Sequence, residues 1–253
     1  MNLTISIILT IVMAALAISF FYMLQAKSAR RATIATVRLI VQTSLVGGCA
    51  YGLMKIDNIL LNLLWLILTT LFAAWYVMMR ARLNRRSMFV AVLGAMLAAV
   101  VVGMLPMYSI GRVHHAALLI PVAGILQCEM AVVLPRALKE YYVALVRFSD
   151  TYYYLLGNGT TWTKAVVPML RRAVDRSFLP AYRKFSRAAL VGLPLLMGGL
   201  LLAGTPLLTA VVATLLLTFS GLVATIVALL LIVVASRQVV TDKRGHLTDK
   251  ARS

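Results

Sequence analysis

Acidic residues are scarce in this chain: only 7 of its 253 residues are Asp or Glu, against 25 Lys or Arg. Charged residues of both signs make up 13% of the chain, whereas a soluble domain contains about 25%. Hydrophobic residues, in contrast, make up 62%. One soluble core cannot bury so large an apolar fraction, so we expect lipid to be the main solvent of this protein.

Several signatures of enzymes and small stabilised domains are also missing. The two cysteines, Cys49 and Cys128, are too few for a disulfide scaffold or a four-cysteine zinc site. The sequence contains no Gly-x-x-x-x-Gly-Lys-Ser/Thr phosphate loop, no His-Glu-x-x-His and no Gly-x-Ser-x-Gly, which are typical of ATPases, zinc proteases and serine hydrolases. No aromatic and basic pattern typical of nucleic-acid binding is found. We therefore predict neither an enzyme nor a nucleic-acid-binding protein.

Long apolar runs dominate what is present. A spanning helix needs roughly 20 apolar residues to cross a hydrocarbon core of about 30 Å. Seven runs approach or exceed this length: 3–25, 36–54, 58–79, 88–109, 116–134, 189–205 and 207–235. The Gly204-Thr205-Pro206 turn separates the last two, which we expect to form a tight hairpin. The sequence thus predicts an all-α, polytopic integral membrane protein with about seven transmembrane helices.

The basic residues predict the orientation of these helices. With the N-terminus outside, 22 Lys and Arg residues fall on inner segments, and only Lys55 and Arg112 fall outside. Since cytoplasmic loops carry the excess of positive charge, we expect the C-terminus in the cytoplasm. Met1-Asn2 supplies no positive region before the first run, so we expect that run to be retained as a helix. Without a repeat or a linker, residues 1–253 are predicted to form a single domain.

Residues 135–188 form a long inner segment between the fifth and sixth runs. Residues 137–156 are expected to continue the preceding helix as far as a break at Gly157-Asn158-Gly159. Thr160 or Thr161 can cap a second helix, whose apolar residues recur at spacings of three and four, with a possible kink at Pro168 and an end at Pro180. Two interpretations stay open: a basic amphipathic helix lying on anionic headgroups, or a docking element for a cytoplasmic partner.

Several short blocks, in this order along residues 35–215, resemble one known family. They are Arg38-Leu39-Ile40-Val41-Gln42, Ile120-Pro121 with Met130, Leu155-Leu156-Gly157 with Arg171-Arg172 and Leu179-Pro180, and Gly192-Leu193-Pro194 with Leu202-Ala203-Gly204. The set resembles the FetB-like iron-export ABC transporter permeases. The chain departs from the family pattern at Gln127-Cys128-Glu129 and at Thr151, where the family carries Gly-Asn-Ser and glutamate, so it looks like a divergent member.

The resemblance implies a permease subunit that pairs with a separate ABC ATP-binding subunit, which would hold the ATP and Mg. It also implies export of a metal ion such as iron by alternating access, from a homodimer in a bacterial inner membrane. Residues 135–188 would be the coupling segment, and the resemblance favours docking for it. We expect its ATPase-coupling surface to include Tyr153, Gly157, Trp162, Arg171 and Arg172. Two alternatives stay open: a secondary transporter or channel working alone, and a membrane scaffold without transport.

Arg38 and Glu129 are charged residues within predicted spans. A charge at the centre of a span costs about 3 kcal/mol on insertion scales, and pairing would reduce that cost. Gln42, one helical turn beyond Arg38, can hydrogen-bond the same carboxylate. We hypothesise that these three residues form a polar cluster at the inner mouth of a translocation pathway. In the alternative, Arg38 reaches the headgroups and Glu129 faces a wet interface.

Two prolines and two histidines complete the candidate residues. Pro121 and Pro194 can break spans locally and free carbonyls that line a pathway, or they can be plain kinks. His114 and His115 lie in an outer loop, and imidazole suits borderline metal ions. A transient exit site for a cation is therefore one interpretation. In the other, both histidines are simply solvated.

Overall fold

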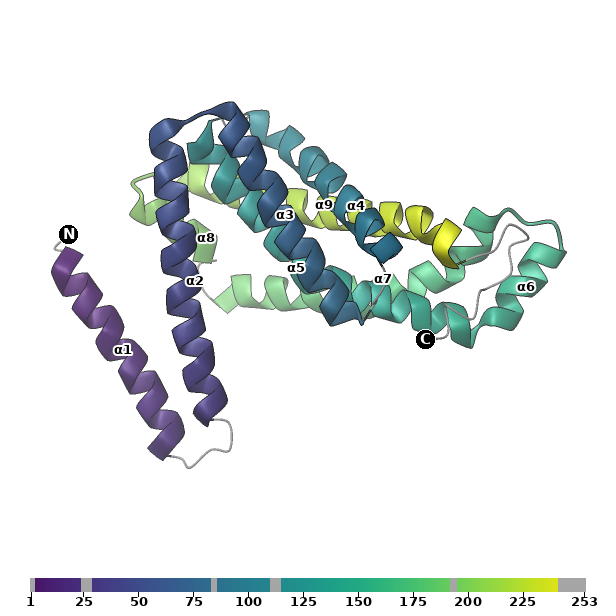
Figure 1. The fold of residues 1–253 in the computed structure, drawn as a ribbon, viewed down its shortest axis with the longest axis horizontal. Coiled ribbons are helices and arrows are strands. Elements are labelled where there is room, and N and C mark those ends of the chain that lie inside the picture. Colours follow the sequence, from purple (N-terminus) through teal and green to yellow (C-terminus); the bar gives the residue numbers. More distant parts are fainter. Residues whose placement is uncertain (1–2, 24–28, 83–85, 110–114, 192–194, 241–253) are drawn as a thin grey trace. The chain divides into compact units, whose positions relative to one another are not determined.

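The computed structural model describes residues 3–23, 29–82, 86–109, 115–191 and 195–240. These residues form α1 (Leu3–Met23), α2 (Ala29–Ile56), α3 (Ile59–Ala81), α4 (Arg86–Met104), the 3₁₀ helix η1 (Leu105–Ser109), α5 (Ala116–Arg147), α6 (Ser149–Gly157), α7 (Trp162–Val191), α8 (Leu195–Leu202) and α9 (Leu207–Val240) (Figure 1). The described ranges contain no strand, in agreement with the predicted all-α class.

Five of the described helices are long and apolar enough to cross a membrane. They cover Arg30–Ile56, Ile59–Ala81, Met88–Ser109, Ala116–Arg147 and Leu207–Arg237. The chain is therefore a multi-pass membrane protein, as the composition indicated. The first predicted run coincides with α1, but the sixth, 189–205, is not one described helix: α7 ends at Val191 and α8 has 8 residues, about 12 Å. The count of seven and the orientation stay predictions.

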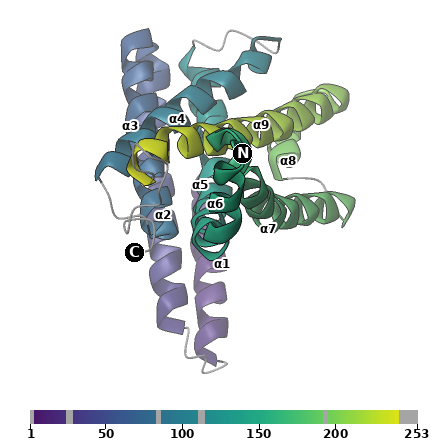
Figure 2. The ribbon, with the colours of Figure 1, turned by 90° about the vertical axis from the view of Figure 1, so that its right-hand side faces the viewer.

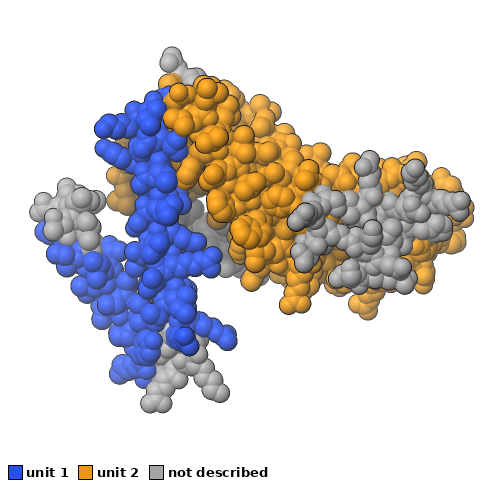
Figure 3. Space-filling view, viewed as in Figure 1, with its two compact units in different colours: residues 1–57 blue, residues 58–253 orange. Residues whose placement is uncertain are grey.

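The chain divides into two compact units, residues 1–57 and residues 58–253 (Figure 3). In the first unit, α1 and α2 contact one another. In the second unit, α5 contacts α3, α4, α7 and α9, and α4 also packs against α9. The organisation of residues 1–253 as one permease domain remains a hypothesis.

Small side chains allow the helices of the second unit to approach closely. A Cβ added at Gly103 of α4 would lie 3.0 Å from the Cβ of Ala224 in α9 and 3.0 Å from Cδ1 of Leu126 in α5. Ala99 and Ala228 are also fully buried. Because lipid tails are as apolar as leucine, helices in a membrane associate through such close packing.

A buried hydrogen bond joins α3 to α5. The Gln127 Nε2 group donates to Thr70 Oγ1 at 2.8 Å, and the Thr70 hydroxyl donates to the Leu66 carbonyl at 2.7 Å. A bond of this kind between membrane helices contributes about 0.6 kcal/mol on average. Gln127 is therefore a packing residue that positions the next two residues of α5, Cys128 and Glu129.

The prediction that the second helix of the inner segment ends at Pro180 is wrong. α7 continues through Pro168 and Pro180 to Val191. A proline removes one helical N–H donor, but Pro180 is exposed, so the carbonyl left without that donor lies on an open side of the helix. Ser177 and Phe178, which lie in the turn that lacks this bond, are buried, and this burial holds α7 in place there.

Candidate functional site

Glu129 lies beside a pocket in the second unit, between helices that are far apart in sequence. Both α7 and α9 pack on α5 (Figures 1 and 2). The pocket between the three helices contains about 560 Å³ of empty space, its open side included. It is lined by Cys128, Glu129, Val132 and Val133 of α5, by Phe178, Ala181 and Tyr182 of α7, and by Thr218, Leu222 and Thr225 of α9. We call it the Glu129 pocket.

Glycine in α9 makes room for the Glu129 carboxylate. A Cβ added at Gly221 would collide with the Oε2 and Cδ atoms of Glu129. No other glycine in the described ranges has a carboxylate as its nearest neighbour. The position of Glu129 therefore depends on the absence of a side chain at Gly221.

The pocket combines one acidic group with mostly apolar surroundings. Among the described residues that line it, Glu129 is the only charged one, and most of the other lining side chains are apolar. The Thr218 hydroxyl donates to the Thr214 carbonyl at 2.8 Å, and the Thr225 hydroxyl donates to the Gly221 carbonyl at 2.7 Å. Since these hydroxyl hydrogens are already used within α9, the threonine oxygens offer lone pairs, and such oxygens suit a cation.

The hypothesis of an Arg38–Gln42–Glu129 cluster stays a prediction. Arg38 and Gln42 are exposed residues of α2, one helical turn apart as expected. They belong to the unit of residues 1–57, whereas Glu129 belongs to the unit of residues 58–253. Sequence reasoning identified Glu129 from its charge, but it did not find Gly221, Thr218 or Thr225, because their proximity depends on the packing of α9 against α5.

The two predicted prolines have different outcomes. α5 continues through Pro121, which is exposed and is not among the residues that line the Glu129 pocket. Its effect on the backbone is local: it removes the N–H that would otherwise donate to the Ala117 carbonyl. Pro194 lies outside the described residues, and its role in a pathway remains a prediction.

The predicted metal site falls partly outside the described residues. His114 lies outside the described residues, and His115 is half-buried at the N-terminal cap position of α5. In the described ranges, no group of three or more His, Cys, Asp or Glu side chains is arranged to hold a metal ion. Met104 and Met107, close to His115 in sequence, are buried and therefore contribute to packing.

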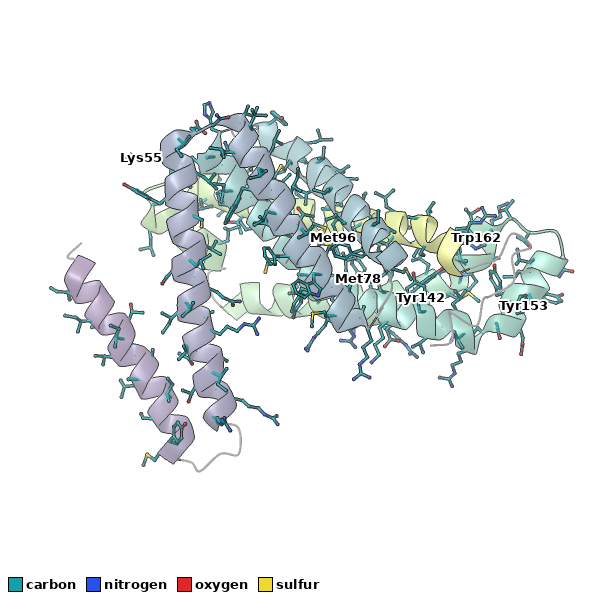
Figure 4. The ribbon with its side chains drawn as sticks, viewed as in Figure 1. Lys55, Met78, Met96, Tyr142, Tyr153 and Trp162 are labelled. Atoms are coloured by element: carbon teal, nitrogen blue, oxygen red, sulfur yellow. The ribbon has the colours of Figure 1, made fainter. Side chains whose placement is uncertain are left out.

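The predicted coupling residues Tyr153, Gly157 and Trp162 surround the turn between α6 and α7. Gly157 is the last residue of α6, Gly159 has a φ of 78°, and Trp162 begins α7. Tyr153 and Trp162 lie at the same end of the second unit (Figure 4). The predicted break at Gly157-Asn158-Gly159 is therefore confirmed.

Trp162 connects this turn to two other helices. The Arg237 Cζ atom of α9 lies 5.1 Å from the centroid of the Trp162 ring, and the Trp162 indole N–H donates to the Tyr152 hydroxyl of α6. Burial raises the pKa of Tyr152, and the neighbouring Tyr153 raises it further, so this hydroxyl stays protonated at neutral pH. Sequence reasoning missed Tyr152 and Arg237, because the contact joins three helices.

Arg171 and Arg172 differ in their surroundings although they are adjacent in α7. The Arg172 guanidinium Cζ lies 3.8 Å from the centroid of the Phe148 ring, at the end of α5. Arg171 is exposed, and it does not line either the Glu129 pocket or the hollow beside Phe148. Of these two predicted coupling residues, Arg171 is therefore more available to a partner.

The comparisons with known proteins give one family. The model of an uncharacterised protein family, UPF0014, matches residues 2–240. No curated protein and no solved structure matches the chain. The match covers all the described helices and most of both compact units.

Proposed function

This chain belongs to the uncharacterised protein family UPF0014, and from this membership, together with its apolar helices, we propose that it is the permease subunit of an ATP-driven ABC transporter. The ordered blocks that resemble FetB-like permeases support the proposal. A separate ABC ATP-binding subunit would supply the ATP and Mg, and two copies of this chain would enclose the pathway. The cargo would be a metal ion such as iron, exported across a bacterial inner membrane.

The observation that carries the proposal is the placement of Glu129. Ionisable residues within membrane helices generally mark pathways for ions or substrates. The Glu129 carboxylate lines a pocket between three helices, and no other described residue that lines this pocket is charged. Carboxylate and hydroxyl oxygens are ligands for hard and borderline cations. A second copy of the chain would bring a second carboxylate and so complete the set of ligands for an ion.

The helices that form the pocket also reach the proposed ATPase contact. α7 is one continuous helix from Trp162 at the α6–α7 turn to Phe178 and Tyr182, which line the Glu129 pocket. Trp162 and Phe178 are about 24 Å apart along this helix. α9 connects Arg237 at the same turn with Thr218 and Leu222 in the lining. In alternating access, a displacement of the turn by the ATPase would therefore be transmitted along both helices to the pocket.

Co-purification is the experiment that tests this function. The chain is expressed with the ABC ATPase encoded next to it, and the complex is reconstituted in liposomes. We expect a stable complex whose ATP hydrolysis is stimulated by Fe(II) or another divalent cation. A chain that binds no ATPase would instead support a transporter that works alone or a scaffold. If only lipid-like compounds stimulated ATP hydrolysis by the complex, the cargo would be a lipid-like compound and not a metal ion.

A further inference from the structure

A second hollow, distinct from the Glu129 pocket, lies between the last turns of α5 and the middle of α7. It contains about 480 Å³ of empty space, its open side included. Its polar lining consists of Glu140 and Arg147 from α5 and Arg172 and Arg176 from α7, with Phe148 beside them. We call it the arginine pocket. Three guanidinium groups and one carboxylate, from two helices, line this hollow.

The charges in the arginine pocket do not balance. The Arg176 Nη1 group lies 3.0 Å from Glu140 Oε2, so Glu140 compensates one arginine. Arg172 stacks on the Phe148 ring at 3.8 Å, and the Arg147 Cζ lies 5.9 Å from the same ring centroid. Stacking uses the face of a guanidinium and leaves its N–H edge available to donate. Two positive charges therefore remain, on groups that can hydrogen-bond an anion.

The position of the arginine pocket along α5 places it at the level of lipid headgroups. Glu140 and Arg147 follow Ala116, the first residue of α5, by 24 and 31 positions. At the helical rise these distances are about 36 Å and 46 Å, whereas the hydrocarbon core is about 30 Å thick and the whole bilayer about 40–45 Å. If α5 crosses the membrane from the opposite surface at Ala116, Glu140 lies at the far headgroup layer and the backbone of Arg147 lies at its outer edge. Glu129, only about 20 Å along the helix, stays within the hydrocarbon.

We propose that the arginine pocket binds the phosphate of an anionic phospholipid headgroup. The planar guanidinium matches the geometry of a phosphate and can donate two parallel hydrogen bonds to it. In the orientation that the basic flanks predict, this end of α5 lies on the cytoplasmic side, where anionic lipids attract basic groups. The other occupant to consider is a free phosphate ion, but only a lipid brings its acyl chains to the apolar surface of α5 below.

A bound headgroup would hold α5 against α7. Without an anion, Arg147 and Arg172, which both lie beside the Phe148 ring, repel one another, and Glu140 is the only acid among the described residues that line the hollow. A phosphate between the two arginines would bridge the helices at the point where α5 ends and the coupling segment begins. The inference requires that α5 spans the membrane with this end in the cytoplasm, but it does not depend on the proposed ATPase partner.

Native mass spectrometry of the purified full chain in detergent tests the proposal. Phosphatidylglycerol and phosphatidylcholine are added in equal amounts, and the bound lipid is counted for each variant. The test variant is Arg147→Gln/Arg172→Gln. The matched control is Lys139→Gln/Arg171→Gln, which removes the same charge from exposed neighbours that do not line the pocket.

We expect the wild type and the control to retain phosphatidylglycerol in preference to phosphatidylcholine. Each basic residue near an anionic headgroup contributes about fivefold in binding, so the test variant, which lacks two, should bind about twenty-five-fold less phosphatidylglycerol. Glu140→Gln provides a variant in the opposite direction: it removes the competing carboxylate and should increase phosphatidylglycerol binding. Misfolding could explain a loss of lipid binding in the test variant, but it would not explain a gain in Glu140→Gln.

Three results would overturn the proposal. Equal losses in the test variant and the control would mean that general charge attraction, rather than this pocket, retains the lipid. Equal retention of the two lipids by the wild type would remove the role of the headgroup charge. Displacement of phosphatidylglycerol by millimolar inorganic phosphate would identify free phosphate as the ligand. Since the chain is measured alone, none of these results depends on whether an ATPase associates with it.

Discussion

Glu129 is the residue on which the proposed transport chemistry depends, because it is the one charged side chain among the described residues that line its pocket. We predict that Glu129→Gln, which keeps the shape and removes the charge, lowers cation transport at least about tenfold, equivalent to about 1.4 kcal/mol of lost binding. Membrane insertion should not suffer, since a neutral side chain is less costly in a span. ATP-driven uptake into inverted vesicles at equal protein measures the effect, and Asp175→Asn on the exposed side of α7 is the control.

The position of the Glu129 carboxylate gives a second residue-scale prediction. Gly221→Ala places a Cβ where the carboxylate now lies, so Glu129 must turn away and transport should fall severalfold. Gly124→Ala is the matched control, because nothing lies within 4 Å of a Cβ at this other helical glycine. In the Glu129→Gln background, Gly221→Ala should cost much less, since the two changes act on one contact. Equal, additive losses would separate Gly221 from Glu129.

At the scale of single residues, the sequence predicts which charged residues matter but not which residues surround them in the fold. Glu129 could be selected because an acid in an apolar run is costly without a function or a partner. Gly221 could not be selected from the sequence, because glycine occurs in membrane helices for several different reasons. Its partner Glu129 also lies 92 positions earlier in the chain. The same holds for Arg147 and Phe148, which become informative only when Arg172 and Arg176 of α7 lie opposite them.

At the scale of elements, the α6–α7 turn depends on Trp162. Trp162→Ala removes the ring under Arg237 and the hydrogen bond to Tyr152, together worth about 1–3 kcal/mol. We predict faster hydrogen exchange over residues 149–165 and poorer coupling of ATP hydrolysis to transport. Trp162→Phe keeps a ring and loses only the N–H, so its effect should be intermediate. Unchanged exchange in Trp162→Ala would show that the turn is held by other contacts.

The helix boundaries show which local signals decide an element. The break at Gly157-Asn158-Gly159 was predictable because its chemistry is local: Gly159 adopts the positive φ that glycine tolerates best. The end at Pro180 was predicted from equally local chemistry and was wrong. There, the burial of Ser177 and Phe178 maintains α7 despite one missing hydrogen bond. Tertiary packing is therefore the term that a single sequence does not contain.

At the scale of the whole molecule, composition and run length predict the class of protein but not the arrangement of its helices. Lipid exposure and helix length follow from the 62% apolar content, and five described spans agree with the predicted runs. The grouping of Arg38 and Gln42 with Glu129 depends instead on how residues 1–57 meet residues 58–253, which the chain's own apolar pattern does not specify. Homodimerisation likewise depends on the shape of an exposed helix surface, which no short sequence motif specifies.

Alternating access predicts that the Glu129 pocket opens to one side of the membrane and then to the other. Cys128 reports on this opening, because it is a free thiol that lines the pocket. In a Cys49→Ser chain paired with its ATPase, a membrane-impermeant maleimide should label Cys128 from one side only. Trapping the ATPase in its ATP-bound state should then change the labelling rate at least about fivefold, which corresponds to a population shift of about 1 kcal/mol.

The second cysteine supplies the control for this experiment. Cys49 lies in α2 and does not line the pocket, so in a Cys128→Ser chain its labelling should respond less to the ATPase. A Cys128 rate that does not change with nucleotide, in a complex that still hydrolyses ATP, would contradict alternating access at this pocket. A rate that changes and is slowed by the transported cation would place the cargo beside Glu129, since a bound ion there would block the approach of the reagent to the neighbouring thiol.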